Sequence, residues 1–211
     1  MAQSKTAQQV RDEHLSVLGQ DLGSLYHALY NEVTWLHAKW NQYRILFAES
    51  PARIELLNDV AGFFFRVIQD VLWEDIVLHL ARLTDPPQSV GKDNLTLLRL
   101  AEAVKEPALS LEVKNLAEQA KAAADFARVW RNRHLAHRDL ALAVDDRATP
   151  LPGISREKID RALAGAGAVL NKIESHFWQS EVAFAQFIQP LGDAESLAYY
   201  LQVAVDGEGR Q

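Results

Sequence analysis

A short basic stretch, RNRHLAHRDL at residues 131–140, contains the side chains best suited to chemistry. Five of its ten residues are arginine or histidine, although the chain as a whole is acidic, with 22 Lys and Arg against 28 Asp and Glu. Arginine supplies a permanent charge and a two-pronged donor for phosphate oxygens, and histidine can exchange a proton near neutral pH. This set suits phosphodiester cleavage. RNA carries its own nucleophile, the 2′-hydroxyl, so its cleavage requires no metal in principle.

The spacing within this stretch distributes its side chains around a helix. On an α-helix each residue advances by about 100°, so Arg133 and His137 are neighbours on one face. A second face, about 120° away, is lined by Arg131, His134 and Arg138. Arg131 and His137 are six positions apart, and they bracket a wide sector that could form one wall of a groove. Asn132 lies between the two faces, where it could hydrogen-bond a ligand or orient a side chain.

A solvated helix face accounts for the same residues without any function. Arg138 could form surface salt bridges with Asp125 or Asp139, each worth less than about 1 kcal/mol. Basic residues near the C-terminal end of a helix also interact favourably with the helix dipole. Composition alone favours this interpretation over a binding or catalytic site.

Other kinds of catalytic site find little support in the sequence. Two pairs of side chains have a spacing that could bind a metal, Asp75 with His79 and His134 with His137. No third or fourth ligand accompanies either pair. We interpret Asp75–His79 as an ordinary intrahelical pair. The chain has no cysteine, no G-x-S-x-G motif and no glycine-rich phosphate loop after a strand. We therefore expect no metal and no cofactor.

Helical periodicity extends over nearly the whole chain, so the predicted fold is all-α. We expect a bundle of four or five long helices plus short helices, forming one domain over residues 1–211. Its ordered core covers residues 8–205, and residues 206–211 are expected to form a flexible tail. The predicted helices cover about residues 8–48, with a break near Gly19 and Gly23, and residues 51–83, 94–105, 110–143, 155–188 and 193–205.

Local signals also assign several helix ends and faces. Ser50 and Pro51 suit the N-cap and the first position of the second long helix. The expected caps of three later helices are Asn94, Ser155 and Asp193. The stripe expected to face the core consists of Leu57, Val60, Phe64, Val67 and Val71. Small residues at 164–168 would allow two helices to approach closely. We expect most of the tryptophans to pack in the core, namely Trp35, Trp40, Trp73, Trp130 and Trp178.

The polar N-terminus does not resemble a secretory signal, and the most apolar stretch makes a poor membrane span. This stretch, residues 60–83, is interrupted by charged residues, among them Arg66, Asp70 and Glu74. We therefore expect a cytoplasmic protein that does not associate with membranes. The net charge of −6 argues against non-specific coating of DNA, but it leaves room for a local site for an anionic substrate.

The basic stretch resembles the hallmark of the HEPN superfamily, which is an arginine, four to six residues and then a histidine, late in a long helix. Here Arg131 and Asn132 are followed by His137, with five residues between the arginine and the histidine. The sequence RNRHLAHRD is similar to the form found in abortive-infection HEPN proteins of the Abi U-like group. The upstream LARLTD at residues 80–85, followed by a loop and NLTLLRL, also resembles that group.

This resemblance implies an all-α HEPN-like fold and a metal-independent endoribonuclease of phage defence or of a toxin–antitoxin system. In such proteins two protomers pair, so that both Arg…His motifs face one cleft. By this resemblance Arg131 would stabilise phosphate charge, His137 would transfer protons and Asn132 would bind or orient the substrate. The remaining substrate contacts would come from Arg133, His134 and Arg138. RNA, a second copy of the chain and an antitoxin are the implied partners.

Two other hypotheses remain open at this point. The first is a non-catalytic helical module that binds RNA, a nucleotide or a partner protein through the same groove, and the second is a structural bundle without a site. An exposed cleft between the motifs of two chains would support the ribonuclease hypothesis, whereas burial of Arg131 or His137 in ion pairs within one monomer would weaken it sharply.

Overall fold

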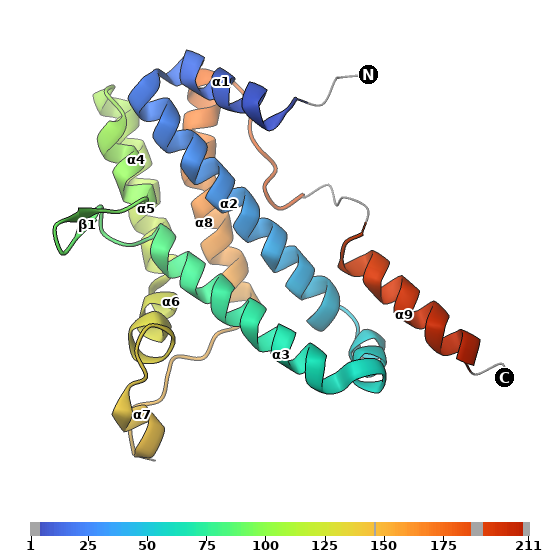
Figure 1. Ribbon diagram of the computed structural model, residues 1–211. Coiled ribbons are helices and arrows are strands. Elements are labelled where there is room, and N and C mark those ends of the chain that lie inside the picture. The colour runs from blue at the N-terminus through green and yellow to red at the C-terminus, as the bar shows by residue number, and fades with distance from the viewer. Residues whose placement is uncertain (1–4, 146, 187–191, 209–211) are drawn as a thin grey trace.

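The computed structural model describes residues 5–145, 147–186 and 192–208. These residues are almost entirely helical, which confirms the predicted all-α fold (Figure 1). The structure adds one minor feature, a two-stranded antiparallel hairpin of β1 (Gln88–Ser89) and β2 (Lys92–Asp93), in the region predicted to be a loop. None of the helices within the described residues is both long enough and apolar enough to cross a membrane.

The first three helices are α1 (Ala7–Leu18), α2 (Gln20–Phe47) and α3 (Pro51–Leu83). The break predicted near Gly19 is confirmed, since Gly19 has a φ of 79° and separates α1 from α2. Gly23 permits α1 to fold back against α2, because a Cβ atom at this position would lie 2.6 Å from the carbonyl oxygen of His14. Ser50 accepts a hydrogen bond from Arg53 N at 3.3 Å, which confirms it as the N-cap of α3.

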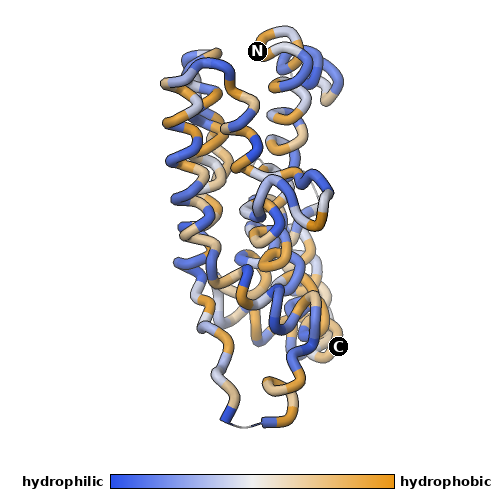
Figure 2. The backbone as a smooth tube through the Cα atoms, turned by 90° about the vertical axis from the view of Figure 1, so that its left-hand side faces the viewer, coloured by the Kyte–Doolittle hydropathy of each residue, from blue (hydrophilic) through white to orange (hydrophobic). Residues whose placement is uncertain are grey.

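The second half of the chain is divided into more elements than predicted. They are α4 (Leu97–Ala103), α5 (Pro107–Ala123), α6 (Asp125–Trp130), the π-helix η1 (Arg131–Leu135), α7 (Leu140–Val144), α8 (Arg156–Phe177) and α9 (Ala194–Glu208). The single helix predicted for residues 110–143 is therefore wrong, because it is divided among four elements. In both views α7 and the loop after it project beyond one end of the bundle (Figures 1 and 2).

The expected helix caps are partly confirmed. Ser155 accepts a hydrogen bond from Lys158 N at 3.3 Å, and Asp193 accepts one from Ser196 N at 2.9 Å, as N-caps do. Asn94 is not a cap, because α4 begins after Thr96. The predicted end of α8 at residue 188 is too late, since the helix stops at Phe177 and residue 188 lies outside the described residues. Helix α9 continues past residue 205 to Glu208, and residues 209–211 are also outside.

The main core lies between α2, α3, α4, α5 and α8. Its largest fully buried side chains include Tyr26, Leu29, Leu36, Ile76, Leu80, Leu97, Leu100, Ile159, Leu163, Leu170 and Ile173. The close approach predicted for the small residues of α8 is confirmed, because a Cβ atom at Gly165 would lie 3.2 Å from Ala120 Cα on α5. Most of the tryptophans are buried or half-buried against this core as expected, whereas Trp35 is exposed.

The stripe predicted to face the core on α3 is largely exposed, which corrects the sequence interpretation. Of its five members only Leu57 is buried, and Phe63 beside the stripe is 86% exposed. The buried face of α3 carries instead Phe65, Ile76, Val77 and Leu80. A non-helical residue within α3, Ala61, changes the direction of the helix, so a periodicity counted across it does not follow one face. The structure thus leaves an apolar surface on the outside of α3.

An aromatic cluster with a buried histidine holds α1 against α2. His14 Nδ1 lies 3.1 Å from His27 Nδ1, and the His14 ring makes edge contacts with Tyr26, Tyr30 and Trp178. Burial and the neighbouring His27 lower the pKa of His14 to about 4. The folded state therefore favours the neutral imidazole.

We predict that this cluster makes the stability of the fold depend on pH. Because the unfolded chain binds a proton at His14 with an ordinary pKa, stability is fully present above about pH 6.5 and is lost as the pH falls toward 4. His14 should therefore contribute a loss on the order of 2 kcal/mol in the free energy of unfolding between pH 7.5 and pH 5. Urea denaturation over this range tests the prediction.

The control is His176→Gln, which changes a histidine outside the cluster and should keep the pH dependence of the original chain. His14→Phe should reduce the pH dependence by the share of His14, because other buried histidines such as His79 also have lowered pKa values. Equal pH dependence in the original chain and in His14→Phe would contradict the assignment.

Candidate functional site

The basic stretch does not lie on a regular α-helix, contrary to the prediction. Residues 131–135 form the π-helix η1, in which Ala136 N donates to Arg131 O at 2.8 Å. The chain then leaves the helix, and Asp139 starts α7 by accepting a hydrogen bond from Ala141 N at 3.0 Å. The helical angles used to group the side chains therefore apply to neither Arg131 nor His137.

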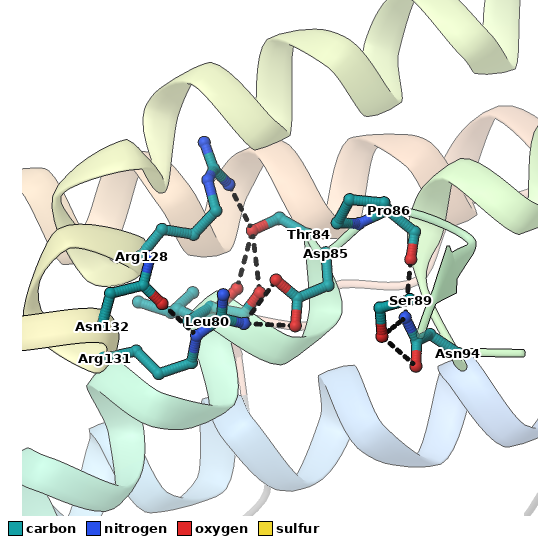
Figure 3. A network of polar contacts seen from close by, with 10 residues as sticks. Leu80, Thr84, Asp85, Pro86, Ser89, Asn94, Arg128, Arg131 and Asn132 are labelled. Carbon is teal, nitrogen blue, oxygen red and sulfur yellow. Dashed lines mark hydrogen bonds and ion pairs between the residues drawn. The ribbon is translucent and has the colours of Figure 1, made fainter. Parts of the chain in front are cut away.

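Arg131 is attached to the end of α3. Its Nη1 contacts both carboxylate oxygens of Asp85, at 2.5 Å from Oδ1, and its Nε donates to Asn132 Oδ1 at 3.0 Å (Figure 3). The side chains of Arg131 and Asp85 are 22% and 18% exposed, so the ion pair is partly buried. This ion pair within one monomer is the arrangement that weakens the ribonuclease hypothesis. Arg131 Nη2, however, makes no hydrogen bond to any residue that the structure describes.

A second arginine reinforces this attachment. Arg128, one turn before Arg131, donates from Nη1 to Thr84 Oγ1 at 2.9 Å (Figure 3). Its Nη2 donates to Lys121 O at 2.7 Å. Thr84 is buried, and its hydroxyl donates to Leu80 O at 3.0 Å. Sequence reasoning assigned no role to Arg128, Thr84 or Asp85. The available signal was the LARLTD segment, which ends with this threonine and aspartate.

Arg133 forms hydrogen bonds with the segment that follows the motif. Its Nε donates to Asp139 Oδ2 at 2.9 Å, and its Nη1 donates to Thr149 O at 3.0 Å. The hydrogen bond from Arg133 lowers the pKa of Asp139. The salt bridges expected for Arg138 do not form in the described residues, because Asp139 pairs with Arg133 and Asp125 pairs with Arg128.

The remaining members of the stretch are more open. His134 packs its ring edgewise on Trp130, and its Nε2 lies 4.0 Å from Glu74 Oε1 on α3. Asn132, His137 and Arg138 are exposed. The side chains of His137 and Arg138 form no hydrogen bond or ion pair with any described residue, so both are free to meet a ligand.

A hollow of about 300 Å³ opens beside the motif. Its polar wall consists of Arg133, His134, Arg138 and Asp139, and its apolar wall of Leu142, Ala143, Pro150 and Leu151. The fold therefore brings three of the predicted substrate contacts together. Arg131 and His137 do not line this hollow, and no hydrogen bond joins their side chains.

The Asp75–His79 pair considered from sequence as a metal site is engaged with other partners. Asp75 pairs with Lys39 rather than with His79, so the intrahelical pair expected there is wrong. His79 Nε2 lies 2.7 Å from Glu32 Oε2, while burial and Lys39 lower the His79 pKa. Within the part of the chain that the structure describes, no three His, Asp or Glu side chains gather as metal ligands.

An all-α bundle with an Arg…His stretch after its α6 helix is the arrangement expected of a HEPN domain. The family model AbiU2, of HEPN type, matches residues 19–196, so the chain belongs to the AbiU2 family of HEPN proteins. The match confirms the resemblance noted from residues 80–85 and 131–139. No curated protein and no solved structure matches the chain.

We predict that Trp130 holds the loop after the motif in place. Its Nε1 donates to Pro152 O at 2.8 Å, which ties residues 147–154 to the helix that precedes η1. Trp130→Phe removes this hydrogen bond and should cost about 1 kcal/mol of stability. Hydrogen exchange of the amides at 147–154 should become faster. Trp35→Phe changes an exposed ring and should leave these rates unaltered, and unaltered rates in Trp130→Phe would refute the assignment.

Proposed function

We propose that the chain is a metal-independent endoribonuclease of HEPN type, acting in phage defence or in a toxin–antitoxin system. This proposal rests on one observation in a domain of the AbiU2 family. Neither the His137 side chain nor Arg131 Nη2 makes a hydrogen bond or ion pair with a described residue, so both can contact RNA. These are the groups that phosphodiester cleavage requires, a titrating imidazole and a fixed cation. An antitoxin partner would act by covering them.

The proposed reaction uses the 2′-hydroxyl of the RNA as its nucleophile. His137 takes the proton of this hydroxyl, the 2′-oxygen forms a bond to phosphorus, and the bond to the 5′-oxygen breaks. The leaving 5′-oxygen gains a proton from a second imidazole. Arg131 stabilises the charge that develops on the non-bridging oxygens. The products are a 2′,3′-cyclic phosphate and a 5′-hydroxyl, and Asn132 positions the strand.

A homodimer supplies what one copy lacks, because the second imidazole comes from the second copy. The exposed apolar face of α3 is the proposed contact surface, with Phe63 and Phe64 86% and 58% exposed. The same side of α3 continues through Val67 and Val71 to Glu74, which lies 4.0 Å from His134 in the motif. A second copy seated on this face would therefore lie beside the basic stretch and close one cleft over both motifs.

The second candidate function is a non-catalytic module that binds RNA, a nucleotide or a partner protein. The hollow beside His134 favours it, since three of the basic residues line this hollow and neither Arg131 nor His137 does. This function predicts saturable, salt-sensitive binding without turnover.

We predict that Arg131→Ala and His137→Ala each reduce RNA cleavage by at least about 10²-fold without changing the helix content. A chelator should have no effect, and the products should end in 2′,3′-cyclic phosphate. Gel analysis of end-labelled RNA with circular dichroism measures both quantities. His176→Ala, a histidine on α8, serves as the matched control. Cleavage that persists in both variants would exclude the proposed site, and saturable binding without any cleavage would support the second function.

We predict that the α3 face holds the dimer together. Burial of a phenylalanine side chain contributes about 1.5–3 kcal/mol, so Phe63→Glu with Phe64→Glu should weaken self-association by more than about 10²-fold. Sedimentation velocity should show a dimer for the original chain and a monomer for the double variant. Leu111→Glu, an exposed apolar residue on α5, is the control. A double variant that still sediments as a dimer would place the interface elsewhere.

A further inference from the structure

We propose that Asp85 is a positioning residue for RNA cleavage, and that it fixes Arg131 with the Nη2 group directed to the phosphate. This inference rests on the proposed function and assigns a role to a residue outside the Arg…His motif. It concerns the direction and mobility of one guanidinium group rather than a new contact with the RNA.

The first support is the division of donors within Arg131. A guanidinium carries five N–H groups, one on Nε and two on each Nη nitrogen. Nη1 is held by both oxygens of Asp85, and Nε is held by Asn132 at 3.0 Å. Only Nη2 makes no hydrogen bond to a described residue. A pairing that masks the arginine would use the two-pronged geometry, in which two nitrogens of the guanidinium donate to the two carboxylate oxygens. The observed pairing uses one nitrogen for Asp85 and leaves the two N–H groups of Nη2 available.

The second support is the rigidity of the chain that carries Asp85. Asp85 N donates to Arg82 O at 3.3 Å, directly after the end of α3. Two prolines follow, and each fixes its own φ and restricts the residue before it. The first of them, Pro86, accepts a hydrogen bond from Asn94 Nδ2 at 2.9 Å (Figure 3). Thr84 is buried and bonded to Arg128. The carboxylate therefore projects from a backbone that is fixed on both sides.

Asp85 has two opposing effects on bound RNA. Its negative charge weakens the attraction of Arg131 for a phosphate in the ground state. Its hydrogen bonds hold the guanidinium where charge develops in the transition state, and misplacement of such a group costs about 10²-fold in rate. Loss of Asp85 should therefore lower the rate of cleavage on saturating RNA, while the affinity for RNA stays equal or rises.

The experiment uses Asp85→Ala and Asp85→Asn, with Glu157→Gln as the matched control. Glu157 pairs with Arg161 on α8, away from the motif, so its loss of charge should leave cleavage unchanged. Single-turnover cleavage on saturating RNA should fall about 10- to 100-fold in Asp85→Ala and less in Asp85→Asn. RNA affinity, measured in a His137→Ala background, should be equal to or higher than that of His137→Ala alone. An unchanged or raised cleavage rate in folded Asp85→Ala would overturn the proposal.

A readout without RNA separates this proposal from the proposed function. The Nε–Hε resonance of Arg131, identified by its loss in Arg131→Lys, should exchange slowly with solvent in the original chain and quickly in Asp85→Ala. If the exchange rates differ in this way but RNA is not cleaved, the proposed ribonuclease activity is wrong. Asp85 would then still position Arg131. If the resonance is the same in both proteins, Asp85 does not position Arg131, whatever the activity.

Discussion

The attachment of the basic stretch to the end of α3 is the interaction on which the site depends. The stretch leaves regular helical geometry at Arg131 and ends its helix before His137, so backbone hydrogen bonds alone hold it weakly. Arg128 and Arg131 compensate by binding Thr84 and Asp85, residues that lie 44 and 46 positions earlier in the chain. Because Thr84 is buried against the core, this attachment holds the motif in a fixed position relative to the helical bundle.

The same contacts explain how an acidic chain can present a local basic surface. Asp85 and Asp139 offset the charges of Arg131 and Arg133, and both arginines are partly buried in these pairs. The exposed polar groups that remain are Asn132, His137 and Arg138. A surface of this kind has little non-specific attraction for nucleic acid, since most of its cations are already paired. The division between paired and free groups agrees with a site that depends on fixed geometry more than on net charge.

The sequence predicted those features that depend on neighbouring residues. Ser50 and Gly19 mark the ends of helices through their own conformations, and the small residues around Gly165 predict a close helix contact. Prediction from the sequence failed where contacts between residues far apart in the chain decide the structure. Nothing within residues 131–139 indicates the π-helix, and nothing in α3 indicates which of two apolar faces is buried. The partner of Arg131 could not be identified, because the spacing of Asp85 along the chain carries no signal of its place in space.

In the proposed ribonuclease, Arg131 and His137 contact one phosphodiester of a bound RNA. A crystal structure with an oligoribonucleotide whose 2′-hydroxyls are methylated tests this contact, since such an RNA can bind but provides no nucleophile. We expect one phosphate within hydrogen-bond distance of Arg131 Nη2 and of a His137 imidazole, with Asp85 still bound to Nη1. RNA bound on another surface, with His137 remote from every phosphate, would exclude this site.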